Sequence, residues 1–180
     1  MLRRQSPKLP KTWLMTDERM GERLIPSIRA LPRGSGIVFR HHTLPPQQRR
    51  SLFKHIRCIA RKNRLMLVFD GAIGAACAVK ADGQHSSDPK RWSRFRTMAV
   101  HNMAERIKAE RIGVDLIFVS PVFRTTTHPG QKPLGRVRFG QLVSGSKTPV
   151  IALGGMTYRQ AKSLRNFEIH GWAAIDGLMR

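Results

Sequence analysis

Short apolar segments alternate with helix-like segments along the whole chain. Two of them, Leu65–Asp70 and Leu116–Val122, are too continuously apolar to be strands with one face in water. Such runs are typical of parallel strands that helices cover on the outside. We count eight segments that predict strands: Trp13–Thr16, Gly36–Arg40, Leu65–Asp70, Asp82–His85, Thr97–Val100, Leu116–Val122, Pro149–Gly155 and Trp172–Gly177.

The segments between these runs carry helix signals. Pro45 and Pro46 suit the first turn of a helix. Asn102 with Glu105 is a variant of the capping box, and Thr157 is a further candidate for an N-cap. The side chains expected to face inward are Leu24, Ile25, Ile28 and Leu31, then Leu52, Phe53, Ile56, Ile59 and Ala60, then Met103 and Ile107, and finally Ala161 and Leu164.

Strand–helix alternation repeated eight times predicts a (β/α)₈ TIM barrel in one domain over residues 1–180. Because such barrels usually exceed about 200 residues, we expect shortened loops and some missing helices, for example over residues 86–96. A doubly wound open sheet is the competing architecture, but no G-x-G-x-x-G follows the first strand. Residues 1–10 are expected to form a mobile basic extension.

The chain is strongly basic, with 33 Lys and Arg against 11 Asp and Glu and a net charge of +22. These residues are scattered and aromatic residues make up only 7 %, so small phosphorylated ligands are favoured and a nucleic-acid-binding protein is the weaker alternative. The sequence leaves a homo-oligomer open.

Composition also excludes several classes of protein. A hydrophobic content of 41 % excludes a disordered chain, and no apolar run approaches the roughly 20 residues of a membrane span. Cys58 and Cys77 are too few for a disulfide scaffold and are expected to be buried, reduced thiols. The N-terminus lacks the apolar stretch of a secretory signal, which predicts a cytoplasmic protein.

Polar residues and glycines gather where the predicted strands end, which is where barrels carry their sites. Gly154 and Gly155 would expose backbone N–H groups to an anion, or they merely permit a tight turn. Arg40 could bind phosphate or pair with Asp70. Asp70 could hold Mg²⁺, or it could cap a turn. Histidines also stand at these ends, and they could be either functional or ordinary hydrogen-bonded residues: His42, His85, His101 and His128.

Three segments of the second half resemble thiamine-phosphate synthase and its thiazole tautomerase relatives. They read V-S-P-V-F-R-T-T-T-H-P-G at 119–130, A-L-G-G-M-T at 152–157 and G-W-A-A-I-D-G at 171–177. Shorter matches precede them, namely V-F-R-H-H at 38–42, F-D-G at 69–71, A-D-G-Q-H at 81–85 and V-H-N-M-A-E at 100–105. The resemblance therefore extends over nearly the whole chain, and it implies a (β/α)₈ barrel.

The resemblance also implies a reaction and its residues. In that family, hydroxymethylpyrimidine diphosphate and thiazole phosphate are joined, and Mg²⁺ with cationic residues draws off pyrophosphate. By position, Arg40 and His128 would be catalytic residues at the diphosphate, and Asp70 would be a metal ligand. The residues that would bind the two phosphorylated substrates are Arg40, His42, Thr125, Thr127, His128, Gly155, Ile175 and Asp176.

The chain departs from the family pattern mainly at the pyrimidine and metal end. Asp88 is the nearest candidate for the family's second metal carboxylate, and Pro121 stands where tautomerases carry a histidine. Two alternatives therefore stay open, a thiazole-phosphate-binding protein of the tautomerase kind and a non-catalytic barrel. Five further positions differ from the family pattern. Where the family has glutamine, lysine, asparagine, serine and a second lysine, this chain has, in the same order, Val38, His42, Phe69, Ala99 and His128.

Overall fold

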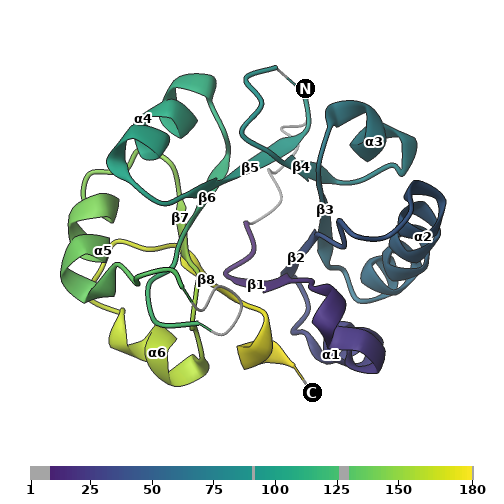
Figure 1. The fold of residues 1–180 in the computed structure, drawn as a ribbon, viewed down its shortest axis with the longest axis horizontal. Coiled ribbons are helices and arrows are strands. Elements are labelled where there is room, and N and C mark those ends of the chain that lie inside the picture. The colour runs from purple at the N-terminus through teal and green to yellow at the C-terminus, as the bar shows by residue number, and fades with distance from the viewer. Residues whose placement is uncertain (1–8, 91, 126–129, 180) are drawn as a thin grey trace, which may run out of the picture.

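Eight parallel strands close into a barrel in chain order, and the helices form a ring outside it (Figure 1). The computed structural model describes residues 9–90, 92–125 and 130–179. The closed barrel confirms the predicted fold and excludes the open sheet. Its strands are β1 (Thr12–Met15), β2 (Gly36–Phe39), β3 (Met66–Asp70), β4 (Gly83–His85), β5 (Phe95–Val100), β6 (Leu116–Val119), β7 (Val150–Ala152) and β8 (Gly171–Ala174).

The helical layer is incomplete, as the short chain predicts. Residues 86–90 and 92–94 contain no helix, so β4 and β5 are joined by irregular chain. Among the described residues, no helix combines the length and apolar character of a membrane span. The helical elements are η1 (Glu18–Arg23), α1 (Leu24–Ala30), α2 (Pro46–Lys62), α3 (Ile73–Ala78), α4 (Met103–Ile112), α5 (Gly135–Val143), α6 (Tyr158–Ser163) and η2 (Asp176–Leu178).

The predicted helix starts are confirmed. α2 begins at Pro46, whose missing N–H would have no partner within the helix at that position. The Asn102 side chain accepts a hydrogen bond from Glu105 N at 2.9 Å, and Thr157 accepts one from Gln160 N at 3.3 Å. These caps satisfy N–H groups that the first turn leaves open, and so they fix where α4 and α6 leave the barrel rim.

Two predictions about burial are wrong. Met103 and Ile107 are 42 % and 50 % exposed, because α4 turns Ala109 inward and leaves those two residues on its outer side. Cys58 and Cys77 are also exposed, because each lies on the outward face of its helix, α2 and α3 respectively. The apolar stripe of α2 is placed as expected, with Phe53, Ile56, Ile59 and Ala60 buried.

Aromatic rings fill the interior of the barrel. Trp13 of β1 stacks on Phe95 of β5 with ring centres 6.2 Å apart, and it meets Phe118 of β6 edge-on at 5.4 Å. Because β1 pairs only with β2 and β8, these contacts must cross the barrel. The Trp13 indole donates to Pro10 O at 2.8 Å. The interior is therefore packed from side to side, and ligands are left only the rims.

The end of the chain before β1 is described only in part. Residues 1–8 of the predicted extension lie outside the described residues. Leu9 and Pro10 are in contact with the barrel, since Leu9 O is 3.0 Å from His170 Nε2 and Pro10 O accepts from Trp13.

Replacing Gly36 with alanine should destabilise the barrel. A Cβ at this position would lie 2.2 Å from the Trp13 ring, which is fully buried and cannot shift freely. We expect a loss of about 1–3 kcal/mol in the free energy of unfolding, measured by urea denaturation. Gly74→Ala is the matched control, because a Cβ there meets nothing within 4 Å and alanine favours the helix. Equal stability of the two variants would contradict this packing.

Candidate active site at the carboxyl ends of the strands

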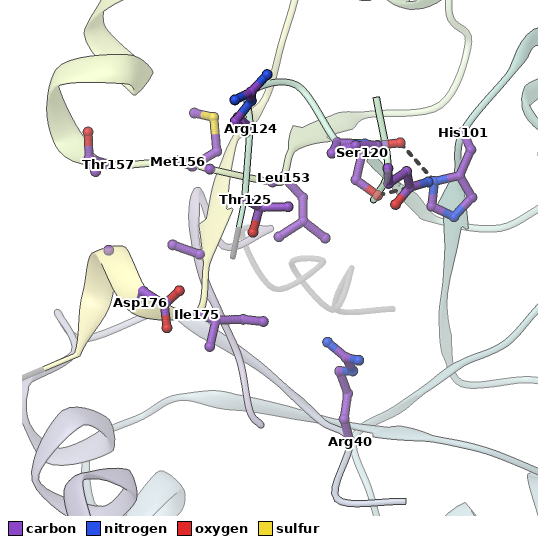
Figure 2. A pocket seen from close by; sticks show the side chains of 16 residues that line it. Arg40, His101, Ser120, Arg124, Thr125, Leu153, Met156, Thr157, Ile175 and Asp176 are labelled. Atoms are coloured by element: carbon purple, nitrogen blue, oxygen red, sulfur yellow. Dashed lines mark hydrogen bonds between the residues drawn. The ribbon is translucent and has the colours of Figure 1, made fainter. Parts of the chain in front are cut away.

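A cavity of about 440 Å³ opens at the carboxyl ends of the strands (Figure 2). Its walls come from the segments that follow β2, β5, β6, β7 and β8, so residues far apart in the sequence meet there. The lining residues are Arg40, His101, Ser120, Pro121, Arg124, Thr125, Gln131, Leu153, Gly154, Gly155, Met156, Thr157, Ala174, Ile175, Asp176 and Gly177.

Glycines shape the side of the cavity that β7 and β8 form. Gly155 has φ +61°, and a Cβ there would lie 2.3 Å from Arg124 O. A Cβ on Gly177 would lie 2.2 Å from Met156 O. Only glycine allows these loops to approach so closely, and bare backbone at a cavity wall lets N–H groups reach a small anion. The two loops therefore suit a phosphate group, as Gly154-Gly155 predicts.

The remaining walls combine two arginines, Arg40 and Arg124, with apolar surface. Arg40 extends into the cavity from the end of β2, opposite Ile175 and Leu153 (Figure 2). His101 follows β5, and its Nδ1 lies 2.7 Å from Ser120 O. A carbonyl only accepts, so Nδ1 carries a proton and donates it to Ser120 O. The cavity thus offers a guanidinium for an anion and apolar walls for a flat ring.

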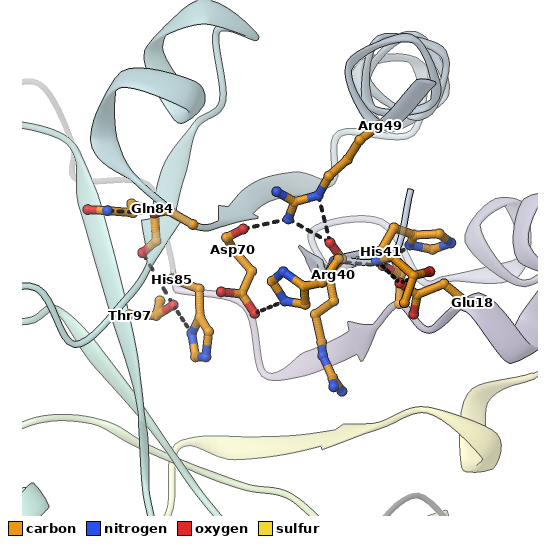
Figure 3. Close-up of polar contacts among 12 residues, drawn as sticks. Glu18, Arg40, His41, Arg49, Asp70, Gln84, His85 and Thr97 are labelled. Atoms are coloured by element: carbon orange, nitrogen blue, oxygen red, sulfur yellow. Dashed lines mark hydrogen bonds and ion pairs between the residues drawn. The ribbon is translucent and has the colours of Figure 1, made fainter. Parts of the chain in front are cut away.

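A second polar group lies beside the cavity, at the ends of β2, β3 and β4 (Figure 3). Asp70 Oδ2 lies 3.1 Å from His42 Nε2. Within the described residues Asp70 therefore pairs with His42 rather than with Arg40, and it does not cap α3, whose N-cap is Ala72. The Arg40 guanidinium is left directed toward the cavity.

Burial lowers the pKa of two histidines at this end of the barrel, His85 and His41. It lowers the pKa of His85, which is buried beside Phe118 and bonded to Thr97 Oγ1 at 2.8 Å. It also lowers the pKa of His41, against the opposing charges of Glu18 and Asp17. Both imidazoles are therefore neutral at pH 7, since their ordinary pKa already lies near 6.5. Of the two interpretations of His85 that the sequence leaves open, the structure agrees with an ordinary hydrogen-bonded residue.

The structure brings most of the predicted site residues to one cavity. Arg40, Thr125, Gly155, Ile175 and Asp176 all line it. His42 and Asp70 form a pair at the adjacent strand ends, outside the lining set. The other two predicted residues, Thr127 and His128, lie outside the described residues.

Asp176 places a carboxylate in the same cavity as the Gly155 loop, where it would repel a phosphate bound there. The charge of Arg19 offsets part of this repulsion. The pKa of Arg19 is raised mainly by its 2.7 Å hydrogen bond to Asp17, and the charge of Asp176 contributes as well. Arg19 thus acts electrostatically on both carboxylates.

Sequence reasoning missed several residues of this region. Arg124, Gln131 and Met156 line the cavity from loops whose path the sequence does not reveal. Arg49 reaches the strand ends from α2, although helical periodicity places it on the polar face. Arg124 and Met156 fall within the matched segments 119–130 and 152–157, but the resemblance does not single them out. Gln131 and Arg49 belong to no motif and could be identified only from the fold.

A larger hollow lies at the opposite, amino-terminal end of the barrel, next to the starts of β3 and β5. Arg64, Arg94, Arg96 and Arg111 line it, but Arg96 is buried and bonded to Ile112 O and Asp88 O. Residues at this end of a barrel serve stability, whereas sites lie at the carboxyl ends. We therefore place the candidate site in the smaller cavity.

The described residues can supply one carboxylate for the predicted Mg²⁺. They contain no group of three or more His, Cys, Asp or Glu side chains placed to hold a metal. Asp88 does not join Asp70. The Asp88 carboxylate accepts a hydrogen bond from Lys90 N, and the Asp88 carbonyl accepts one from the Arg96 side chain. That side chain also donates to Ile112 O at the end of α4, so it ties Asp88 to a different part of the barrel. Since Mg²⁺ is often held by one carboxylate together with substrate phosphates, Asp70 alone fits such a site.

The comparisons with known proteins agree with this geometry. A sequence profile of the family described as thiamine monophosphate synthase matches residues 14–178. The chain is 28 % identical to "Putative thiamine-phosphate synthase 2" of Aquifex aeolicus, over 94 % of this chain and 97 % of that protein. It is 26 % identical to "Thiamine-phosphate synthase" of Pyrococcus horikoshii, over 94 % and 86 % of the two chains.

Solved structures show the same fold. Thiamine phosphate pyrophosphorylase from Pyrococcus furiosus superimposes with a TM-score of 0.76 at 21 % identity, over 94 % of this chain and 87 % of that chain. FabK from Thermotoga maritima gives a TM-score of 0.73 at 12 % identity, over 94 % and 59 % of the two chains. At such identities the likeness shows the barrel alone. The profile match, which covers far more than half of the chain, shows that this protein belongs to the thiamine monophosphate synthase family, and it confirms the resemblance found in the sequence.

Proposed function

We propose that this chain is a transferase of thiamine biosynthesis that joins hydroxymethylpyrimidine diphosphate to thiazole phosphate and releases pyrophosphate. The observation that carries this proposal is the gathering of Arg40, Thr125, Gly155 and Ile175 around one cavity in a member of this family. The same proposal includes a cytoplasmic location. The thiamine-phosphate synthase names of the relatives agree with it.

The reaction breaks one bond and forms another. The C–O bond between the pyrimidine methylene and the diphosphate breaks, and the bonding electron pair leaves with pyrophosphate. The lone pair of the thiazole nitrogen then forms a C–N bond to the resulting cationic carbon, giving thiamine phosphate. Such a reaction needs a stabilised leaving group and an aligned nucleophile more than it needs a proton carrier.

The residues of the chain divide this work between two ends of the site. The backbone at Gly155 and Asp176, with Thr125 and Thr127, holds the thiazole monophosphate. The diphosphate binds to Arg40, His42 and His128. The apolar side chains of Leu153 and Ile175 keep water from the reacting carbon. A bound Mg²⁺ would be held by Asp70, and it would supply positive charge that stabilises the departing pyrophosphate.

Purified protein should form thiamine phosphate when it is incubated with both substrates and Mg²⁺. The product can be oxidised to its fluorescent thiochrome derivative and separated by chromatography. Thiazole phosphate binding without product would contradict the transferase and favour the tautomerase-like or non-catalytic barrel. Salt-sensitive binding of duplex DNA, without product or substrate binding, would favour the nucleic-acid alternative.

Asp70→Asn should lower activity by roughly 10–100-fold at limiting Mg²⁺, with part of the loss recovered at high Mg²⁺. The amide removes the negative charge that attracts the ion but keeps the size of the side chain. Activity measured across a Mg²⁺ titration gives the result, with Asp88→Asn as the matched control, because that carboxylate serves only a local turn. Identical Mg²⁺ dependence of Asp70→Asn and the unaltered protein would contradict the assignment.

A further inference from the structure

One arginine outside the cavity binds the ends of two neighbouring strands together. Arg49 lies on α2, one helix turn after the helix begins, and its guanidinium extends back to the barrel rim (Figure 3). Its Nε and Nη2 donate to Arg40 O at 2.9 and 2.6 Å, and Nη2 also donates to Asp70 O at 2.5 Å. A single side chain thus connects the carbonyls of the two residues expected at the diphosphate.

The guanidinium is itself held in place by aromatic rings. It lies 4.3 Å from the centre of the Phe69 ring and 5.6 Å from that of Phe39, the residues that precede Asp70 and Arg40. Phe53, one helix turn beyond Arg49, packs edge-on against both rings at 5.3 and 5.5 Å. Arg49 therefore has little freedom, and its position is set by the core of the barrel.

These donors do not face the cavity. Arg49 does not line the cavity, and two of its three guanidinium nitrogens are engaged with main-chain carbonyls. A contact of Nε or Nη2 with substrate would break this arrangement, and no part of Arg49 belongs to the cavity wall through which Nη1 could reach a ligand. Arg49 must therefore affect the reaction through Arg40 and Asp70, because it holds the main-chain carbonyls of these two residues.

We infer that Arg49 is a positioning residue that fixes the Arg40 guanidinium and the Asp70 carboxylate relative to each other at the diphosphate end of the site. This inference rests on the proposed function. A planar guanidinium can hold two carbonyls at a fixed separation, whereas an ammonium group acts as a point charge and cannot. A small displacement of catalytic groups costs about 10²-fold in rate, so loss of this connection should be measurable.

Two variants separate geometry from charge. Arg49→Met keeps an apolar stem against Phe69 but removes all donors, and Arg49→Lys keeps the positive charge but not the planar group. Both should lower kcat/KM for hydroxymethylpyrimidine diphosphate by about 10²-fold, through kcat as well as KM. The KM for thiazole phosphate should stay unchanged, because the monophosphate end lies on β7 and β8. Arg50→Met is the matched control on the same helix.

Binding of inorganic pyrophosphate provides a readout that does not depend on turnover. Calorimetry should show affinity falling by ten-fold or more in both Arg49 variants, while affinity for thiazole phosphate is kept and circular dichroism shows a folded barrel. Wild-type values in Arg49→Lys would show that charge suffices and would overturn the inference. An equal loss at both ends of the site would also overturn it, because that result indicates a merely structural role.

The two proposals fail in different ways. If the unaltered protein binds pyrophosphate but forms no thiamine phosphate, the proposed function fails, and the pyrophosphate affinities of the Arg49 variants still decide the inference. If the unaltered protein forms thiamine phosphate and the Arg49 variants match it in every constant, the inference alone fails. If the unaltered protein binds no pyrophosphate and forms no product, both are overturned.

Discussion

Replacing Arg40 with methionine should reduce kcat/KM for hydroxymethylpyrimidine diphosphate by roughly 10²–10³-fold. Arg40 is the guanidinium that extends into the cavity from β2, and its carbonyl rather than its side chain is engaged by Arg49. In the proposed reaction, its loss removes a fixed positive charge from the place where the departing pyrophosphate would accumulate negative charge. Steady-state kinetics with each substrate varied in turn gives the measurement.

The control for this variant is Arg33→Met, which removes an exposed arginine from the turn before β2, at the opposite end of the strand. Both variants lower the net charge of the protein by one unit, so the effect of net charge alone is the same in the two. Equal kinetics in the two variants would mean that Arg40 contributes only to the overall positive field. A loss confined to Arg40→Met would instead show a local role.

Gly155→Ala should weaken thiazole phosphate binding by about 100-fold or more, while the barrel stays folded. The added Cβ would lie 2.3 Å from Arg124 O and 3.0 Å from Phe123 Cβ, and it must displace one of the loops that form the proposed phosphate position. The residue also has φ +61°, where a side chain is strained. A misplacement of about 1 Å is enough for such a loss.

Gly113→Ala is a control matched in backbone conformation. Gly113 has φ +67° at the end of α4, but a Cβ there meets nothing within 4 Å and lies far from the cavity. Both variants therefore bear a similar backbone strain of about 1 kcal/mol, and only Gly155→Ala disturbs the loops. Calorimetry with thiazole phosphate compares them, and unchanged affinity in Gly155→Ala would show that the monophosphate binds elsewhere.

The sequence predicts the barrel well because its strongest signals are local. Strands buried on both faces are continuously apolar, as in β3 and β6, and caps such as Asn102 and Thr157 mark helix starts through their own hydrogen bonds. The same locality explains the failures. The buried face of α4 is set by its packing against β5, and spacing alone favours Met103 and Ile107 over Ala109.

Much of the candidate site could be found only by its position relative to the strands. Arg40, Gly155 and Ile175 each follow an apolar run, so the rule that sites lie at the carboxyl ends of barrel strands identifies them. Arg49 follows no such rule, because its long side chain crosses from a helix to two strands. Asp88 shows the reverse error, since nearness in sequence to β4 does not bring it to Asp70.

A crystal structure of the protein with thiamine phosphate and pyrophosphate tests the central claim most directly. We predict the monophosphate against the backbone of Gly155 and Asp176, and the pyrophosphate between Arg40 and Asp70. Both molecules should lie at the carboxyl ends of the strands with the thiamine methylene carbon between them. Density for either molecule only in the hollow at the opposite end, among Arg64, Arg94 and Arg111, would contradict it.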